Sequence, residues 1–215
     1  MDSICIYAAA DLHGRPDRFD IVAKQAARPD IGLVVLAGDL INYTGGRAGL
    51  KRLASLPKPL LAVRGNTDPR RIAASVPAGR GIDFLDIERR CIDGLAVVGI
   101  GGTLPIPFRS RIGWSERRRL ERLAGLVDNR TIIVAHPPPW GVRDRVAGRW
   151  HAGSRGLRRL VAQVAPAVLI CGHIHEAAGV GRIGPTLVVN CALGKQGRGA
   201  IISYDGDGKP RARML

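Results

Sequence analysis

Residues 4–14 of the chain read ICIYAAADLHG. The apolar run from Ile4 to Ala10 is followed at once by Asp11 and His13, whose carboxylate and imidazole groups bind metal ions in proteins. A run that is apolar at almost every position is typical of a strand with both faces covered. The segment therefore predicts a buried strand that carries two polar ligands at its carboxyl end.

The same arrangement, an apolar run and then a polar ligand, recurs four times along the chain. The runs and their ligands are residues 31–37 with Asp39, 60–63 with Asn66, 131–135 with His136, and 167–171 with His173 and His175. Ligands of α/β proteins bind outside the carboxyl ends of the strands, so all seven side chains are predicted to meet at one place. Four of the five histidines belong to this set, and Gly172 supplies the bend that lets two of them point at one ion.

Helical patterns separate several of these runs. Two helices are expected in the first part of the chain, one over about residues 18–27 and one with Leu50, Leu53 and Leu56 at helical spacing that ends at Pro57. Two more are expected later, one over residues 115–127 with Ser115 as N-cap and one after Ser154, which is also an N-cap. A hairpin is expected at Asp93-Gly94, and further strands at residues 186–190 and 200–204. This alternation, without repeats or a linker, predicts an α/β fold in one domain over residues 1–215, with two helix-covered sheets forming a sandwich.

The chain of 215 residues carries a formal net charge of +15, and 28 of its 33 basic residues are arginine. Such a surface attracts polyanions in a salt-dependent way. The arginines are dispersed, however, and the small clusters at residues 117–119 and 158–159 have no aromatic residues interleaved to stack bases. Genomic base composition is therefore favoured as the origin of the arginines, and nucleic acid is not favoured as a partner.

The cysteines, the apolar runs and the N-terminal residues indicate in which cellular compartment the protein is expected. Four widely spaced cysteines (Cys5, Cys91, Cys171 and Cys191) form no CxxC pair and are expected to be reduced and structural. No apolar run reaches the roughly 20 residues that span a bilayer, and residues 1–5 lack the basic region of a secretory signal. The sequence thus predicts a cytoplasmic protein without a membrane segment, and leaves its oligomeric state open.

Five short motifs in this sequence resemble those of the calcineurin-like metallophosphoesterase family. They are Asp11-Leu12-His13, Gly38-Asp39, Gly65-Asn66-Thr67-Asp68, Ala135-His136 and Gly172-His173-Ile174-His175. The match is closest to small members without a cap domain, and it implies a sandwich of two mixed β-sheets flanked by helices. In the family's pattern Asp11, His13 and His175 hold one metal ion, Asn66, His136 and His173 hold a second, and Asp39 bridges the two.

The resemblance implies a metal-dependent phosphoesterase. Imidazole, carboxylate and amide ligands suit Mn, Fe, Zn, Ni or Co, and manganese is favoured here. Two such ions about 3.5–4 Å apart share a water, lower its pKa and clamp the phosphoryl oxygens during in-line attack. The expected substrate is a small phosphate ester or a nucleotide-type ester.

The third motif departs from the family's pattern, because Thr67 stands where a histidine usually follows Asn66, while Asp68 is retained. Threonine has no useful pKa for general-acid catalysis, which favours a phosphodiesterase over a monoesterase, or else lowers activity. His151 is a candidate for the missing acid, although packing in a loop near Trp140 or Trp150 is the simpler interpretation. The catalytic candidates are thus Asn66, Thr67, Asp68 and His151, and Arg64 and Arg143 are candidates to hold an anionic substrate.

Two other functions compete with a phosphodiesterase. A nuclease would use the same site with the basic surface, and its binding to single strands would weaken steeply with salt. An interaction scaffold, as in the retromer subunit of this fold, would have lost catalysis. Only Thr67 supports the scaffold, since all seven ligand positions are intact.

Overall fold

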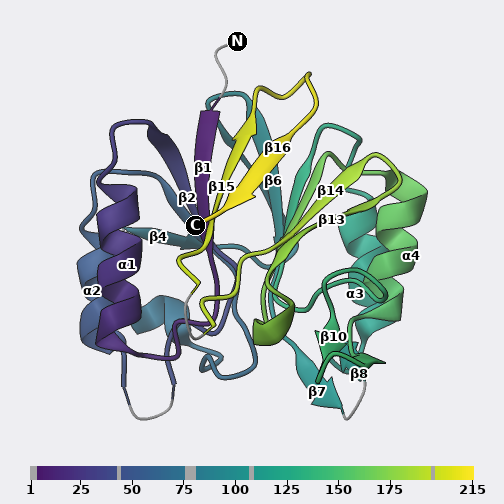
Figure 1. The fold of residues 1–215 in the computed structure, drawn as a ribbon, viewed down its shortest axis with the longest axis horizontal. Helices are drawn as coiled ribbons and strands as arrows, with labels where there is room; N and C mark the ends of the chain where they lie inside the picture. The colour runs from purple at the N-terminus through teal and green to yellow at the C-terminus, as the bar shows by residue number, and fades with distance from the viewer. Residues whose placement is uncertain (1–3, 43–44, 76–80, 107–108, 195–196) are drawn as a thin grey trace.

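Two six-stranded sheets lie face to face in the computed structural model, with helices on the outer side of each (Figure 1). The structure describes residues 4–42, 45–75, 81–106, 109–194 and 197–215. Residues 1–3, which belong to the segment predicted to lack a secretory signal, lie outside these ranges. The predicted fold class, an α/β sandwich of two mixed sheets, is confirmed.

The first sheet has the strand order β16-β15-β1-β2-β3-β4. Its strands are β1 (Ile4–Ala9), β2 (Ile31–Leu36), β3 (Leu60–Ala62), β4 (Ile82–Phe84), β15 (Ala200–Tyr204) and β16 (Arg211–Met214). Strands β1 to β4 are parallel, whereas β15 runs antiparallel to β1 and β16 antiparallel to β15. Helices α1 (Pro16–Ala26) and α2 (Arg47–Ala54) cover its outer face through a cluster that includes Phe19, Leu50 and Leu53.

The second sheet has the order β13-β14-β12-β9-β6-β5. Its strands are β5 (Glu88–Ile92), β6 (Leu95–Ile100), β9 (Ile132–Ala135), β12 (Val168–Cys171), β13 (Gly179–Ile183) and β14 (Thr186–Asn190). The four inner strands are parallel and the two edge strands antiparallel. Helices α3 (Glu116–Ala124) and α4 (Arg155–Val164) cover this sheet through Leu120, Leu123 and Leu157.

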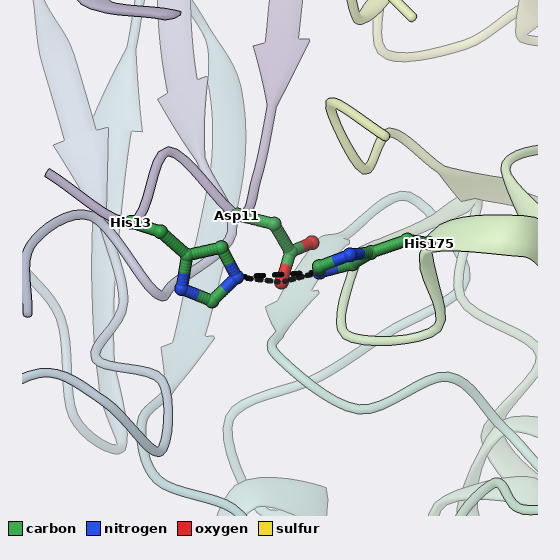
Figure 2. A group of neighbouring side chains, drawn as sticks. All are labelled: Asp11, His13 and His175. Carbon is green, nitrogen blue, oxygen red and sulfur yellow. Dashed lines mark hydrogen bonds and ion pairs between the residues drawn. The ribbon is translucent and has the colours of Figure 1, made fainter. Parts of the chain in front are cut away.

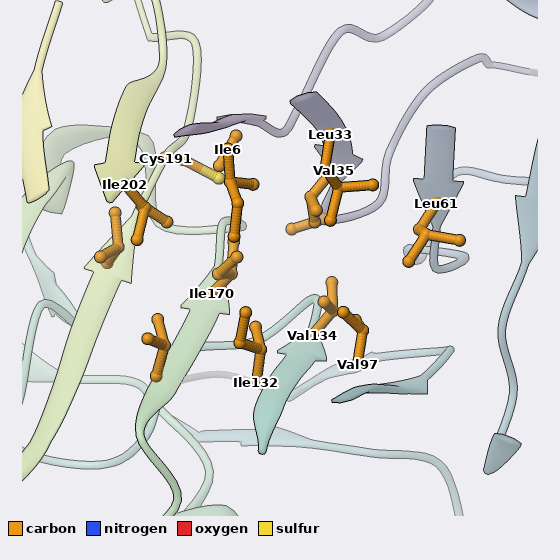
Figure 3. Packing of buried hydrophobic residues seen from close by; sticks show 14 of the residues in the cluster. Ile6, Leu33, Val35, Leu61, Val97, Ile132, Val134, Ile170, Cys191 and Ile202 are labelled. Atoms are coloured by element: carbon orange, nitrogen blue, oxygen red, sulfur yellow. The ribbon is translucent and has the colours of Figure 1, made fainter. Parts of the chain in front are cut away.

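The apolar layer between the sheets explains why the strands are apolar at successive positions. Ile6 and Val35 of the first sheet face Val134 and Ile170 of the second, and all four are at most 1% exposed (Figure 3). The alternate residues of the same strands, such as Tyr7, pack under the helices. Both faces of each central strand are therefore buried, as the nearly continuous apolar runs predict.

Short elements complete the chain. They are η1 (Ile72–Ser75), η2 (His175–Ala177), and two hairpins, β7 (Leu104–Ile106) with β8 (Arg109–Arg111), and β10 (Arg145–Val146) with β11 (Trp150–His151). The hairpin expected at Asp93-Gly94 is confirmed, since it joins β5 to β6 and both residues have positive φ, 46° and 83°.

The two expected N-caps differ in outcome. Ser154 is confirmed, because its Oγ accepts a hydrogen bond of 3.0 Å from the Leu157 amide. Ser115 also occupies the N-cap position of α3, as expected, but its side chain makes no capping hydrogen bond. Glu116 is instead turned into the protein, where its Oε1 accepts from the Ile112 amide at 3.0 Å and from the Ser154 hydroxyl at 2.7 Å. The buried carboxylate thus ties the starts of α3 and α4 together.

The four cysteines are free thiols, as expected. Cys171 and Cys191 are fully buried, whereas Cys91 is exposed on the edge strand β5. Within the described ranges, no helix has both the length and the apolar content to cross a membrane.

Backbone hydrogen bonds join the two sheets at the carboxyl ends of their strands. The Ala10 amide donates to the Cys191 carbonyl at 3.2 Å, and the Leu193 amide donates back to the Ala10 carbonyl at 3.0 Å. Cys191 itself donates to the Cys171 carbonyl at 2.8 Å. The end of β1 is therefore fixed beside the ends of β12 and β14, although they belong to different sheets.

Candidate metal centre

The seven predicted ligands all lie just beyond the carboxyl ends of strands. Asp11 and His13 follow β1, Asp39 follows β2 and Asn66 follows β3, all from the first sheet. The remaining ligands come from the second sheet: His136 follows β9, and His173 and His175 follow β12. The candidate centre thus lies at the junction that the hydrogen bonds of Ala10 hold closed.

A first group consists of Asp11, His13 and His175, which point toward one another in Figure 2. Asp11 Oδ1 is 3.2 Å from His175 Nε2 and 3.8 Å from His13 Nε2, and the two Nε2 atoms are 3.3 Å apart. Asp11 is fully buried, and its Oδ1 has no hydrogen-bond partner within the described residues. Because a buried carboxylate oxygen without a partner is costly, a cation among these three atoms fits the arrangement.

A second group surrounds Nε2 of His136, which is fully buried. This nitrogen lies 3.1 Å from Asn66 Oδ1, 3.4 Å from Asp39 Oδ2 and 3.9 Å from Asp11 Oδ1. The other ring nitrogen, Nδ1, donates to the Ala37 carbonyl at 2.7 Å, because a carbonyl can only accept. That bond orients the ring and leaves Nε2 as the ligand atom in the neutral tautomer.

His173 stands beside this second group. Its ring centroid is 5.0 Å from that of His136, and its backbone amide donates to Asp11 Oδ2 at 2.9 Å. Burial and the neighbouring His136 lower the pKa of His173 to about 4, so its imidazole is neutral, the form that binds metals. The structure therefore brings Asp11, His13, Asp39, His136 and His175 into two groups and places Asn66 and His173 alongside them.

Four of the ligands have a left-handed backbone, which non-glycine residues adopt at a cost. The φ angles are 64° at Asp11, 51° at His13, 54° at Asp39 and 70° at His173. Such strain persists only where the surrounding structure determines it, and it concentrates at functional sites. The chain turns sharply after β1, β2 and β12, and these turns aim the side chains at a common point.

Three glycines beside the ligands permit the close approach of the loops. A Cβ at Gly38 would lie 2.6 Å from His136 Nδ1, and one at Gly65 would lie 2.1 Å from Asp39 Oδ1. One at Gly172 would lie 2.6 Å from an oxygen of the Asp11 carboxylate. Larger side chains at these positions would displace the ligands.

The electrostatics of the group favour a cation. Burial raises the pKa of Asp39, but the hydrogen bond and charge of His136 outweigh it and hold that pKa well below its usual range. Burial likewise lowers the pKa of His136, yet Asp39 and Asp11 together raise it to about 9. The Asp11 carboxylate, whose Oδ1 lies 3.2 Å from His175 Nε2, raises the pKa of His175. The charged carboxylates thus draw protons onto His136 and His175, and a divalent metal would take the place of those protons.

Thr67 and Asp68 hold the ligand loops. The Thr67 amide donates to Asp39 Oδ1 at 2.8 Å, and its hydroxyl donates to the Ile41 carbonyl at 2.9 Å. The Asp68 carboxylate is buried and accepts three backbone bonds, from Leu40 and Ile41 at 2.9 Å and from Gly65 at 2.8 Å. These contacts favour a positioning role for both residues.

The other sequence candidates have partners outside the two ligand groups. His151 Nδ1 is 2.6 Å from Asp144 Oδ1, and the His151 ring packs at 5.5 Å from that of Trp140, the packing expected for a loop histidine. Arg143 donates its Nε to the Val180 carbonyl at 2.7 Å. Arg64 is half-buried, and its carbonyl accepts from the Gly102 amide at 2.6 Å.

Three supporting residues were not found from the sequence. Arg18 on α1 is 9% exposed and donates to the carbonyls of Asp11 and Gly194. Asn190 is a polar residue at the end of a strand, the same positional signal as the ligands. Asp144 is fully buried, and no local pattern marks it as the partner of His151.

The fold is of the metallophosphoesterase type, and the two ligand groups could each hold a metal ion. The family model for calcineurin-like phosphoesterases matches residues 5–177, and the chain belongs to that family. It is therefore a phosphoric ester hydrolase by family. An uncharacterized protein of Methanocaldococcus jannaschii, MJ1162, is 27% identical over 196 residues, which cover 86% of either chain.

Solved structures share the fold. The protein TT1561 of Thermus thermophilus has a TM-score of 0.69 at 18% identity, and the match covers 99% of this chain and 98% of that one. An archaeal phosphodiesterase has a TM-score of 0.54 at 16% identity, covering 99% of this chain and 100% of that one. At these identities the likeness concerns the fold alone.

Proposed function

We propose that this chain acts, as a single domain, as a metal-dependent phosphodiesterase on a small or nucleotide-type phosphate ester. The observation that carries the proposal is the pair of ligand groups that share the buried, partnerless Asp11 Oδ1. One cation would be held by Asp11, His13 and His175, and a second by Asn66, His136 and His173, with Asp39 between the two. Manganese is the proposed metal, and the free thiols agree with a reducing compartment, the cytoplasm.

The residues of the chain have distinct tasks in this reaction. When bound, two divalent cations supply Lewis acidity that activates water and neutralises the phosphoryl oxygens. Asp39 is kept ionised by His136, and the Thr67 amide fixes its other oxygen. The Thr67 hydroxyl already donates its one proton to Ile41, so it does not protonate a leaving group. The absence of an acid at this position favours diesters and esters with good leaving groups.

His151 is the proposed alternative source of a proton. Its Nδ1 bonds to the buried Asp144, an arrangement that fixes the ring and directs Nε2 away from the carboxylate. The side chain is 30% exposed, so the imidazole is open to solvent.

The test compares bis-p-nitrophenyl phosphate with p-nitrophenyl phosphate in the presence of Mn²⁺. We expect faster turnover of the diester, with loss of activity in Asp39→Asn and in His136→Ala. Arg117→Ala, whose side chain is 93% exposed, is the matched surface control and should keep full activity. Faster cleavage of the monoester would refute the interpretation of Thr67, and the absence of any metal-dependent turnover would favour the scaffold.

One observation supports a nuclease as the second candidate. Trp114 is 83% exposed and lies two residues before the start of α3, close in sequence to the arginines of that helix. An exposed aromatic ring beside basic residues can stack a base. Binding of single-stranded oligonucleotides that is lost in Trp114→Ala and weakens steeply with salt would favour this function over action on small esters.

A further inference from the structure

A cavity of about 430 Å³ lies between the β10–β11 hairpin and η2. The charged and polar side chains that line it include Arg143, Arg145, His151 and Glu176. Its volume is in the range of pockets that bind small organic molecules, including a nucleoside-sized group. The metal ligands do not line it, so it is separate from the site described above.

The walls of the cavity continue the loops that carry the metal ligands. Glu176 directly follows His175 in η2, and Arg143 lies on the Pro-rich loop that begins after His136. Asn190 clamps these two loops together, because its Nδ2 donates to the Arg143 carbonyl at 3.1 Å and to the Ile174 carbonyl at 2.9 Å. The cavity is therefore fixed beside the metal centre.

A buried carboxylate organises the hairpin side of the cavity. Asp144 Oδ2 accepts from the amides of Gly141 at 2.9 Å and Gly153 at 3.0 Å, while Oδ1 is 2.6 Å from His151 Nδ1. The Trp140 ring packs against the imidazole. His151 is thus held in one orientation. Such preorganisation is a property of binding sites, because it lowers the entropy lost when a ligand binds.

The charges around the cavity favour an anion. Many arginines of this protein pair with acidic side chains, but in the described residues neither Arg143 nor Arg145 forms an ion pair with a carboxylate. Their bonds go to backbone carbonyls, of Val180 at 2.7 Å and of Gly148 at 3.3 Å. Glu176, the one acid that lines the cavity besides Asp144, accepts from the Ala147 amide at 3.1 Å. Two guanidinium groups are therefore available to a phosphate.

The geometry points to a second substrate subsite, which binds a phosphate carried by one alcohol part of the diester. This inference rests on the proposed function, because the scissile phosphate would lie at the metal centre while the additional phosphate binds Arg143 and Arg145. It assigns the substrate to nucleotide-type diesters with an extra terminal phosphate.

The test uses two substrates that differ only in this group. They are thymidine 5′-(p-nitrophenyl phosphate) and the same compound with a 3′-phosphate, each assayed with the Mn²⁺-loaded protein. In both, water adds to the 5′-phosphorus, the bond to p-nitrophenolate breaks with its electron pair, and a proton passes to solvent. We expect the 3′-phosphate to lower KM by about tenfold, the effect of a single charge-assisted hydrogen bond.

Variants test whether the cavity causes that gain. Arg145→Ala removes an exposed side chain and should abolish most of the difference between the two substrates, whereas Arg117→Ala, which removes the same charge elsewhere, should preserve it. An equal KM for both substrates, or equal effects of Arg145→Ala and Arg117→Ala, would overturn the inference.

A binding measurement separates this inference from the proposed function. Calorimetry with the Mn²⁺-loaded protein compares thymidine 3′,5′-bisphosphate with thymidine 5′-monophosphate and needs no turnover. Tighter binding of the bisphosphate, weakened about tenfold in Arg145→Ala, supports the subsite even if no ester is hydrolysed. If both esters were hydrolysed but the bisphosphate bound no more tightly than the monophosphate, the phosphodiesterase activity would stand and the subsite would be refuted.

Discussion

Replacing Gly65 with alanine is expected to disable the metal centre through a single methyl group. The added Cβ would lie 2.1 Å from Asp39 Oδ1 and 2.4 Å from the Asp39 amide nitrogen. Gly65 does not have a positive φ, so alanine can adopt its backbone without strain, and the effect is purely steric. Asp39, the proposed bridging ligand, must therefore move.

The required displacement can be worked from these contacts. Non-bonded heavy atoms settle at about 3.5 Å, so the Asp39 oxygen must shift by more than about 1 Å. That shift also breaks its hydrogen bond of 2.8 Å from the Thr67 amide. A misplacement of about 1 Å at a reacting centre costs about 10²-fold in rate. We expect kcat/KM for bis-p-nitrophenyl phosphate to fall by about that factor.

The assay pairs Mn²⁺-dependent turnover with the metal content of the purified protein. Gly125→Ala is the control, because Gly125 has a φ of −68° at the end of α3 and its nearest contact would be an ordinary 3.6 Å. The control should keep its activity and metal content, whereas Gly65→Ala should lose metal as well as rate. If Gly65→Ala bound a full complement of metal and turned over at close to the rate of the parent protein, the view of Asp39 as a fixed bridging ligand would be refuted.

Two further predictions concern stability. Ser154→Ala should lower the free energy of unfolding by about 1–3 kcal/mol in urea titrations, because it removes the cap of α4 and the partner of the buried Glu116. Ser115→Ala, which loses no cap hydrogen bond, should change that free energy by less than about 0.5 kcal/mol. Equal effects of the two substitutions would contradict this view of the two helix starts. Without metal, the raised pKa of His136 contributes stability that is complete below pH 6.5 and is lost as pH rises through about 9, a change of order 3 kcal/mol. The Tm of the metal-free protein should therefore fall across that window, and saturating Mn²⁺ should remove the trend. A flat Tm without metal would count against the coupling of His136 with Asp39.

The central strands and the metal ligands could be predicted from the sequence for one physical reason. A strand buried on both faces is apolar at successive positions, as in β1, so the first polar residue beyond it, Asp11, marks where the strand ends. The same logic located His136 after β9.

Elements with weaker local signals were missed. Strand β13 contains two glycines among its five residues, and β16 alternates exposed and half-buried residues at the edge of its sheet. Hairpin β10–β11 has two residues in each strand, too few for any periodicity. The pairing of His151 with Asp144 depends on that hairpin, so no sequence pattern could reveal it.

Strand β1 pairs with β2 on one side and with β15 on the other, so the first sheet combines early and late parts of the chain. A ribosome releases the N-terminal segments first, and β1 emerges long before residues 200–204. Until those residues leave the exit tunnel, the edge of β1 that pairs with β15 has no hydrogen-bonding partner. His173 and His175 are also synthesised late. With the proposed ligands, the cations would therefore be loaded after most of the polypeptide has been translated.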